Sequence, residues 1–314
     1  MNYNDKPLMT SYTNIASLFS QIQIEDKHVA WLFLNYFNLR WEKMSNTLIP
    51  CGHSIFNNYL SILNCPFLTV MIEPIQDFSY ENVDLWINSG YNILLPINTQ
   101  KMGVTENEVF VHDILITALN KNHYEVYDFW RPSFKWSPKW VEAEQVRFSV
   151  DDSNSLLFNK LILLKPKQSY ECTVDNKVIK LALENYCNLS DKAELQDTGN
   201  TVYSQFIQYI NETESPKVLA ATNFQILVDH FTLLQTLVPW ILKVKFTCKH
   251  DVYMKVENHI TVILNHAINL RNYALKIWYR SSDNNIWKSK INNSLQQIQQ
   301  QEKELLELVL TIVD

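Results

Sequence analysis

VHDILITALNKNHYEVYDFW, residues 111–130, places a histidine at the head of an apolar run and an aspartate near the end of the next one. The stretch Asn120-Lys121-Asn122-His123 between the runs predicts a hairpin turn, because Asn tolerates the left-handed backbone that short hairpin loops need. In an antiparallel pair, residues near the start of one strand and the end of the next can lie across from each other. We therefore expect His112 and Asp128 to meet side by side, as a base and the carboxylate that orients it.

A cysteine within reach of this histidine would complete a Cys-His-Asp set for thiol acyl transfer. If the order along the chain is Cys, His, Asp, only Cys51 and Cys65 qualify. Cys51 opens the segment CGHSIFNNYLSILN after Pro50, and the spacing of its apolar residues predicts a helix. A thiol at a helix N-terminus has a lowered pKa, and the backbone N–H groups there can hold an oxyanion.

Cys65 precedes Pro66 at the end of that predicted helix and lacks both advantages. We therefore favour Cys51 as the nucleophile. The alternative is that Cys51 is a small buried apolar residue without catalytic work, which is the commoner role of a cysteine in an apolar context.

Composition excludes several other function classes. A net charge of -6 without runs of Lys or Arg argues against a nucleic-acid surface. Four glycines in 314 residues leave no glycine-rich phosphate loop. The five cysteines contain no C-x-x-C, and no histidine pair has the H-E-x-x-H pattern, so we expect neither a disulfide framework nor a metal site. Without a signal-peptide pattern or a long apolar run, we expect a soluble, cytoplasmic protein with no membrane partner.

Hydrophobic periodicity changes along the chain. Short runs rich in β-branched and aromatic residues predict an antiparallel sheet, and the helical period takes over after about residue 176. The predicted strands span residues 67–73, 91–97, 109–119, 124–130, 146–150 and 160–165. The predicted helices span residues 177–187, 201–212, 217–245, 250–281 and 287–313. This order predicts an α+β fold, divided near the QDTGN stretch at residues 196–200.

An aromatic segment, FWRPSFKWSPKW at residues 129–140, follows the predicted aspartate strand. Its prolines predict a loop beside the site, in which Trp130 and Trp136 would line a channel for an acyl or aryl group. Arg131, Lys135 and Lys139 give the loop a basic edge that suits an acidic carrier protein or a phosphopantetheine phosphate. The alternative is that these aromatic side chains pack an edge of the core.

The quoted residues also carry a family resemblance. PCGHSIFNNYL, at residues 50–60, resembles the nucleophile helix of butirosin-biosynthesis-H-like proteins. HDILITALN followed by VYDFW resembles their histidine and aspartate strands. The wider relatives are papain-like cysteine proteases, including the double-glycine leader peptidases of bacteriocin exporters and the homologues that form amides on thiotemplated intermediates. The resemblance implies a papain-like catalytic domain over residues 1–195, with a helical C-terminal region over 196–314.

The resemblance also implies an activity. Such proteins take an acyl group from the phosphopantetheine thioester of an acyl or peptidyl carrier protein and pass it to a small amine, with no cofactor of their own. It implies Cys51, His112 and Asp128 as the catalytic residues. Leader peptidases keep an oxyanion-donating Gln six residues before the Cys, where this chain has Ser45, so the neighbouring Asn46 becomes the oxyanion candidate. Two alternatives stay open: a non-catalytic scaffold that docks a carrier protein, and a peptidase or thioesterase in which water replaces the amine.

Overall fold

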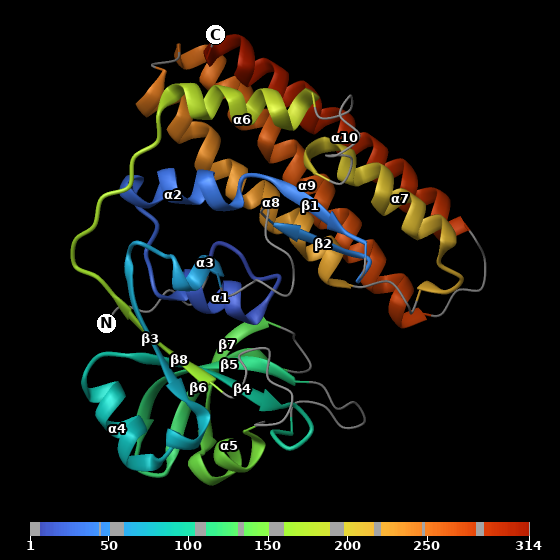
Figure 1. The fold of residues 1–314 in the computed structure, drawn as a ribbon. Helices are drawn as coiled ribbons and strands as arrows, with labels where there is room; N and C mark the ends of the chain where they lie inside the picture. Colours follow the sequence, from blue (N-terminus) through green and yellow to red (C-terminus); the bar gives the residue numbers. More distant parts are fainter. Residues whose placement is uncertain are drawn as a thin grey trace. The chain divides into compact units, whose positions relative to one another are not determined.

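A computed structural model describes residues 7–43, 45–50, 60–103, 111–130, 135–150, 160–188, 198–216, 221–246, 249–280 and 286–313. These residues form an α+β fold with antiparallel sheets and a helical C-terminal region, which confirms the predicted class (Figure 1). The chain divides into two compact units. A sheet unit comprises Met1–Gln23 and Phe56–Glu171, and a helical unit comprises Ile24–Ile55 and Cys172–Asp314.

This division differs from the predicted boundary between residues 195 and 196. An early segment of the chain belongs to the helical unit, because its aromatic and polar side chains pair with residues far along the sequence. The rings of Phe37 and Tyr186 lie 5.3 Å apart, and the backbone N–H of Leu48 donates to Asn223 Oδ1 at 2.8 Å. Local composition does not reveal contacts between residues that are far apart in sequence. A boundary predicted from local hydrophobic periodicity alone therefore lies too late in the chain.

The core of the sheet unit is a six-stranded antiparallel sheet in the order β3-β8-β4-β5-β6-β7. Each predicted strand at residues 67–73, 91–97, 109–119, 124–130 and 160–165 coincides with an observed one. The strands are β3 (Leu68–Pro74), β4 (Asn92–Asn98), β5 (Val111–Asn120), β6 (His123–Trp130), β7 (Lys135–Glu142) and β8 (Lys160–Pro166).

Helices cover both faces of this sheet. Helices α4 (Tyr80–Asn88) and α5 (Ala143–Ser149) pack on the face that carries Leu95 and Ile97. Helix α1 (Thr13–Ser20) covers the opposite face, where Trp136 Nε1 donates to Ser20 Oγ at 2.9 Å. Two short segments flank β3: the helix α3 (Leu60–Leu63) and the 3₁₀ turn η2 (Ile75–Asp77). Helix α4 begins at a Ser79 cap, whose hydroxyl accepts from the backbone N–H of Asn82.

Two predictions for the sheet unit were wrong. Residues 131–134 of the predicted loop over 129–140 lie outside the described residues, but residues 135–140 belong to strand β7, which accommodates Pro138 because β7 lies at the edge of the sheet, where proline is tolerated. The predicted strand at 146–150 is instead the end of helix α5. Ala143 and Val146 are both buried, and their spacing of three residues is the helical one.

The helical unit confirms the predicted C-terminal helices, each within a few residues. They are α6 (Asn176–Asn188), α7 (Val202–Glu212), α8 (Ala221–Trp240), α9 (His250–Arg280) and α10 (Ile286–Val313). Helix α8 continues as the π turn η7 (Ile241–Lys245) just after Pro239, and the 3₁₀ turn η5 (Gly199–Thr201) leads into α7. The early segment adds α2 (Asp26–Tyr36) and the hairpin of β1 (Leu39–Glu42) and β2 (Thr47–Pro50).

Within the described ranges, the helical stretch Ala221–Val244 alone is long and apolar enough to cross a membrane. In its most apolar window 72% is buried inside the protein, which is typical of the core helix of a soluble protein. The buried Asp229 and His230 lie in the same helix. These features agree with the expected soluble chain.

Candidate active site

His112 and Asp128 come together on the sheet. The Nε2 atom of His112 lies 3.0 Å from Oδ2 of Asp128. The Asp128 side chain is fully buried, and that of His112 is 18% exposed. The second oxygen of the carboxylate, Oδ1, accepts from the backbone N–H of Phe129 at 2.7 Å. Two hydrogen bonds therefore hold a buried carboxylate against one edge of a partly accessible imidazole.

We expected His112 and Asp128 to lie directly opposite each other. They are instead diagonal neighbours on the two strands. Leu115 pairs with Tyr127, so one further step along the ladder sets Ile114 across from Asp128. His112 lies two residues beyond Ile114 on the same face of β5. Diagonal partners lie further apart than direct ones, but the long imidazole and carboxylate side chains span the difference.

A β-bulge in β5 puts both side chains on one face. Close to the turn, Ala118 pairs with Glu125, whereas beyond Thr117 the pairing is Ile116 with Val126. Thr117 is the extra residue, and its hydroxyl donates to Glu125 Oε2 at 2.6 Å. Direct partners share a face, so without the bulge even-numbered residues of β5 would share a face with odd-numbered residues of β6. His112 and Asp128, which we call the dyad, share a face because Thr117 is left out of the strand pairing.

The turn itself differs in detail from the prediction. Asn120 pairs with His123, which leaves Lys121 and Asn122 as the two loop residues. Lys121, and not an asparagine, adopts the positive φ of 51°. Its carbonyl accepts a hydrogen bond from Tyr80 Oη at 2.6 Å, which ties the turn to helix α4.

The geometry assigns a role to each ring nitrogen of His112. An ionised carboxylate only accepts hydrogen bonds, so the neutral imidazole beside Asp128 carries its proton on Nε2. Nδ1 is then the nitrogen that accepts a proton in an acid–base step. The carboxylate fixes the tautomer and stabilises the imidazolium when it forms. A base held in this way can deprotonate a thiol or an amine.

The predicted nucleophile, Cys51, lies among residues 51–59, outside the described part of the chain. The alternative nucleophile, Cys65, is 3% exposed, and burial raises the pKa of its thiol far above the ordinary value. Burial also raises the pKa of Cys172, and it raises that of Cys187 to about 12. A reactive thiolate is the charged form that burial disfavours. None of these three described cysteines suits a nucleophile.

The oxyanion candidate, Asn46, belongs to the helical unit, in the turn between β1 and β2. It adopts a φ of 50°, a left-handed conformation that asparagine tolerates better than most residues. Its carbonyl accepts a hydrogen bond from Asn223 Nδ2 at 3.1 Å. These contacts give Asn46 a structural role in the hairpin.

The two tryptophans predicted to bind substrate lie on opposite faces of the sheet. Trp130 shares the face of Asp128; it is buried, its Nε1 donates to the carbonyl of Ser137 at 2.8 Å, and Lys139 Nζ lies 4.6 Å from the centre of its ring. Trp136 pairs with Phe129 in the ladder and is buried against α1. The structure therefore brings Trp130 alone of the two to the side of the dyad.

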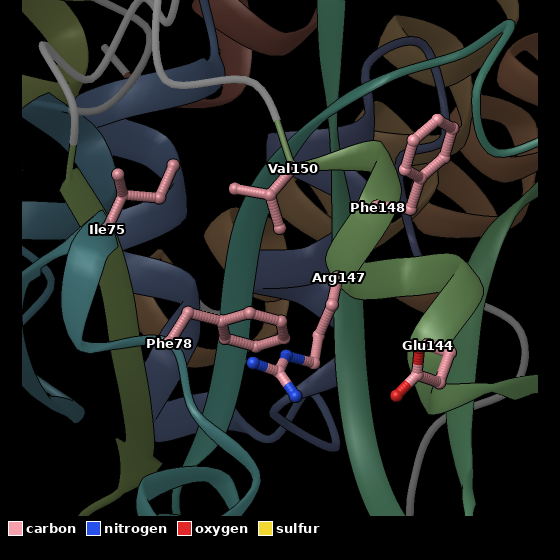
Figure 2. A pocket seen from close by; sticks show the side chains of 6 residues that line it. All are labelled: Ile75, Phe78, Glu144, Arg147, Phe148 and Val150. Carbon is pink, nitrogen blue, oxygen red and sulfur yellow. The ribbon is translucent and has the colours of Figure 1, made fainter.

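Sequence reasoning missed a cavity on the same face as the dyad. It measures about 480 Å³ and lies between η2 and helix α5 (Figure 2). Its lining comprises Ile75, Phe78, Glu144, Arg147, Phe148 and Val150. The cavity depends on helix α5, whereas residues 146–150 were predicted to be a strand. The spacing of Ala143 and Val146 is the signal that could have identified the helix.

Among the described residues, no group of three or more His, Cys, Asp or Glu side chains is placed to hold a metal ion. Compared with protein-family models and with curated proteins, the chain matches none of them.

Proposed function

We propose that this chain is a papain-like, cysteine-dependent acyltransferase. It forms an amide from an acyl thioester on a carrier protein and a small amine. The observation that carries the proposal is the contact of His112 Nε2 with Asp128 Oδ2 at 3.0 Å, which supplies an oriented base. The nucleophile in this proposal, Cys51, is assigned from the sequence, and the raised pKa values of Cys65, Cys172 and Cys187 support that assignment.

The proposed reaction has two halves. In the first, His112 takes the proton of Cys51, and the thiolate attacks the thioester carbonyl; the carrier thiolate leaves and takes the proton from the imidazolium. One thioester replaces another, so this half is nearly balanced in free energy. In the second, the amine attacks the acyl-enzyme, His112 takes the amine proton, and the Cys51 sulfur leaves and regains a proton. Asp128 stabilises the imidazolium in both halves.

The substrate supplies its own phosphopantetheine arm, so the proposal needs no resident cofactor. A carrier protein is the proposed macromolecular partner, and the proposed reaction takes place in the cytoplasm and involves no nucleic acid, which agrees with the net charge of -6. Lys139, which lies over the Trp130 ring beside Asp128, contributes positive charge on the dyad's face.

Intact-mass spectrometry tests the proposal directly. The full chain is incubated with an acyl-loaded carrier protein, and the mass of the acyl-enzyme is sought before an amine is added. Cys51→Ala should abolish the adduct, while Cys172→Ala, a matched control in the described part of the chain, should retain it. An adduct that persists in Cys51→Ala would remove that residue from the mechanism. Amide product separates acyl transfer from a peptidase or thioesterase, which would release the free acid.

One observation favours a second candidate, a non-catalytic scaffold that docks a carrier protein. Asp128 is completely buried and both of its oxygens have hydrogen-bond partners, so the dyad also meets the requirements of a structural pair. The scaffold predicts carrier binding with no acyl adduct and a Cys51 thiol that is inert to iodoacetamide near neutral pH. The acyltransferase predicts rapid alkylation of the same thiol.

A further inference from the structure

The cavity beside helix α5 combines an apolar wall with the cation of Arg147, and a second cation, Lys101 Nζ, lies 5.5 Å from the centre of the Phe148 ring at its edge. Four of its lining side chains are apolar: Ile75, Phe78, Phe148 and Val150. The remaining two, Glu144 and Arg147, come from the same helix (Figure 2).

Phe148 is 69% exposed, so most of its ring is open at the edge of the cavity. In Figure 2 the guanidinium of Arg147 lies beside the ring of Phe78.

Among the described residues, no carboxylate lies within salt-bridge distance of Arg147, although the Glu81 carboxylate of helix α4 attracts it electrostatically from a longer distance. In Figure 2 the Arg147 guanidinium extends toward Phe78, on the side away from Glu144, the other charged residue of the cavity. A guanidinium presents a planar fork of N–H donors that matches the two oxygens of a carboxylate. The chemistry that fits this cavity is therefore an apolar body that carries an anionic group.

The sheet register ties the cavity to the dyad. Ile97 pairs with His112 on one side and forms an isolated bridge with Val150 on the other. Direct partners in a sheet share a face, so Val150, Ile97 and His112 form one row on one face. Adjacent strands lie about 4.8 Å apart, which sets the backbones of Val150 and His112 about 10 Å from each other. The cavity wall and the proposed base thus face the same side of the sheet.

We infer that this cavity binds the acyl part of the substrate, and that the preferred acyl group has an aryl or alkyl body and a carboxylate distal to the reacting carbonyl. The assignment as an acyl subsite rests on the proposed acyltransferase function. The binding of an apolar carboxylate itself does not, because it needs only the cavity and Arg147. Phe78 and Phe148 contact the body of the ligand, and Arg147 binds its carboxylate.

Calorimetric titration of the full chain carrying Cys51→Ala tests the inference, since this variant cannot be acylated. The probe is 3-phenylpropanoate, and 3-phenylpropanamide is its neutral match. The carboxylate should bind about tenfold or more tightly than the amide, because only the carboxylate forms charge-assisted hydrogen bonds with Arg147.

Two substitutions in helix α5 give effects of opposite sign. Arg147→Gln should weaken 3-phenylpropanoate about tenfold, whereas Glu144→Gln should strengthen it a few-fold by removing a nearby negative charge. Lys177→Gln, which removes an exposed cation from the helical unit, should leave the affinity unchanged. Equal binding of acid and amide, no binding of either, or unchanged affinity in Arg147→Gln would each overturn the inference.

The outcomes separate this inference from the proposed function. Carboxylate binding that depends on Arg147, combined with no acyl transfer in the native sequence, would keep the cavity as a ligand site and remove the acyltransferase. Acyl transfer without carboxylate binding would keep the proposed acyltransferase and would remove the cavity as a site for an apolar carboxylate.

Discussion

His112 and Asp128 share a face of the sheet because Thr117, five residues after the histidine, is left out of the strand pairing. Their sequence separation is even, and a regular hairpin with a two-residue loop sets residues of opposite parity on each face. Beyond the bulge, even-numbered residues of β5 share a face with even-numbered residues of β6, and both His112 and Asp128 lie in that half of the hairpin. The 3.0 Å contact is therefore a property of the bulge as much as of the two side chains.

Deletion of Thr117 tests this relationship. The shortened strand should pair regularly, and His112 or the apolar residues of β5 must then change face. We expect loss of the Nε2 contact with Asp128, seen as a changed imidazole nitrogen shift in NMR, together with a lower free energy of unfolding.

Thr117→Val is the matched control for this deletion. It keeps the residue count and removes only the hydroxyl that donates to Glu125. Its imidazole shift should equal that of the native sequence; a native shift in the deletion variant as well would show that the bulge does not position the dyad.

Asp128→Asn removes the charge of the carboxylate and nearly keeps its shape. A neutral amide stabilises an imidazolium poorly and can select the wrong tautomer, an exchange that costs roughly 10⁴-fold in a Ser-His-Asp triad. We expect acyl transfer to fall at least about 100-fold, with the loss in turnover rather than in KM. Circular dichroism should report a folded protein. Turnover within a factor of about two of the native value would remove Asp128 from the mechanism.

Periodicity predicted most of the fold and the two residues of the dyad. The five C-terminal helices and strands β3, β4, β5, β6 and β8 have long apolar patterns of one period, which is where such predictions are strongest. The edge strand β7 was not predicted because Pro138 interrupts it and only one of its two tryptophans, Trp136, is buried, so it shows no regular buried alternation. The bulge at Thr117 was not predicted, because one extra residue changes the pairing of β5 with β6 without changing the local hydrophobic pattern.

The unit boundary and the cavity needed tertiary information. Residues 24–55 join the helical unit through contacts such as that of Trp41 with Phe206, whose rings lie 5.5 Å apart although the residues are far apart in sequence. The cavity depends on helix α5, where VRFSV alternates like a strand but follows Ala143 in a helical repeat. In both places a local pattern was compatible with two structures, and packing decided between them.

Substitution of Glu302 in helix α10 should lower the free energy of unfolding more than most substitutions in the helical unit. Its Oε1 lies 2.6 Å from His230 Nε2 and 2.8 Å from the Tyr186 hydroxyl, and all three side chains are buried. Glu302→Ala removes the acceptor that His230 and Tyr186 share and leaves them only their weak 3.4 Å contact with each other, so we expect it to lower the free energy of unfolding by about 3 kcal/mol or more.

Urea unfolding followed by helical circular dichroism measures this change. Glu304→Ala, an exposed carboxylate on the same helix that accepts from Gln300, is the control and should change the free energy of unfolding by about 0.5 kcal/mol or less. A loss in Glu302→Ala no larger than in this control would contradict the role of the buried cluster.

Alkaline pH should destabilise the folded protein. Burial raises the pKa of Tyr186 and Tyr203 well above 10, helped by the Glu302 carboxylate, and burial raises the pKa of Tyr124 to about 12. In the unfolded chain these phenols ionise near pH 10, so above that pH the folded state holds more protons and its stability falls as pH rises. Below pH 10 both states are protonated, and the groups have no effect.

Each such tyrosine contributes up to about 1.4 kcal/mol per pH unit above pH 10. Tyr186→Phe should therefore flatten the decline measured by urea unfolding between pH 8 and pH 11.5. Tyr279→Phe, which removes an exposed hydroxyl, is the control and should leave the slope as it is. An unchanged slope in Tyr186→Phe would exclude ionisation of that phenol as a cause of alkaline unfolding.

Thiol labelling distinguishes the cysteines by burial. With its pKa raised to about 12, Cys187 is thiolate at pH 7 in a fraction of roughly 10⁻⁵, against about 3% for an unperturbed thiol. Cys65 and Cys172 have raised pKa values for the same reason, which is loss of hydration. We expect iodoacetamide to leave Cys65 and Cys187 unmodified in the native protein, to modify the more accessible Cys172 only slowly, and to modify all five cysteines in urea, as read by peptide mapping. Rapid native labelling of Cys65 would make it the better nucleophile candidate, whereas selective labelling of Cys51 is the result that the acyltransferase requires.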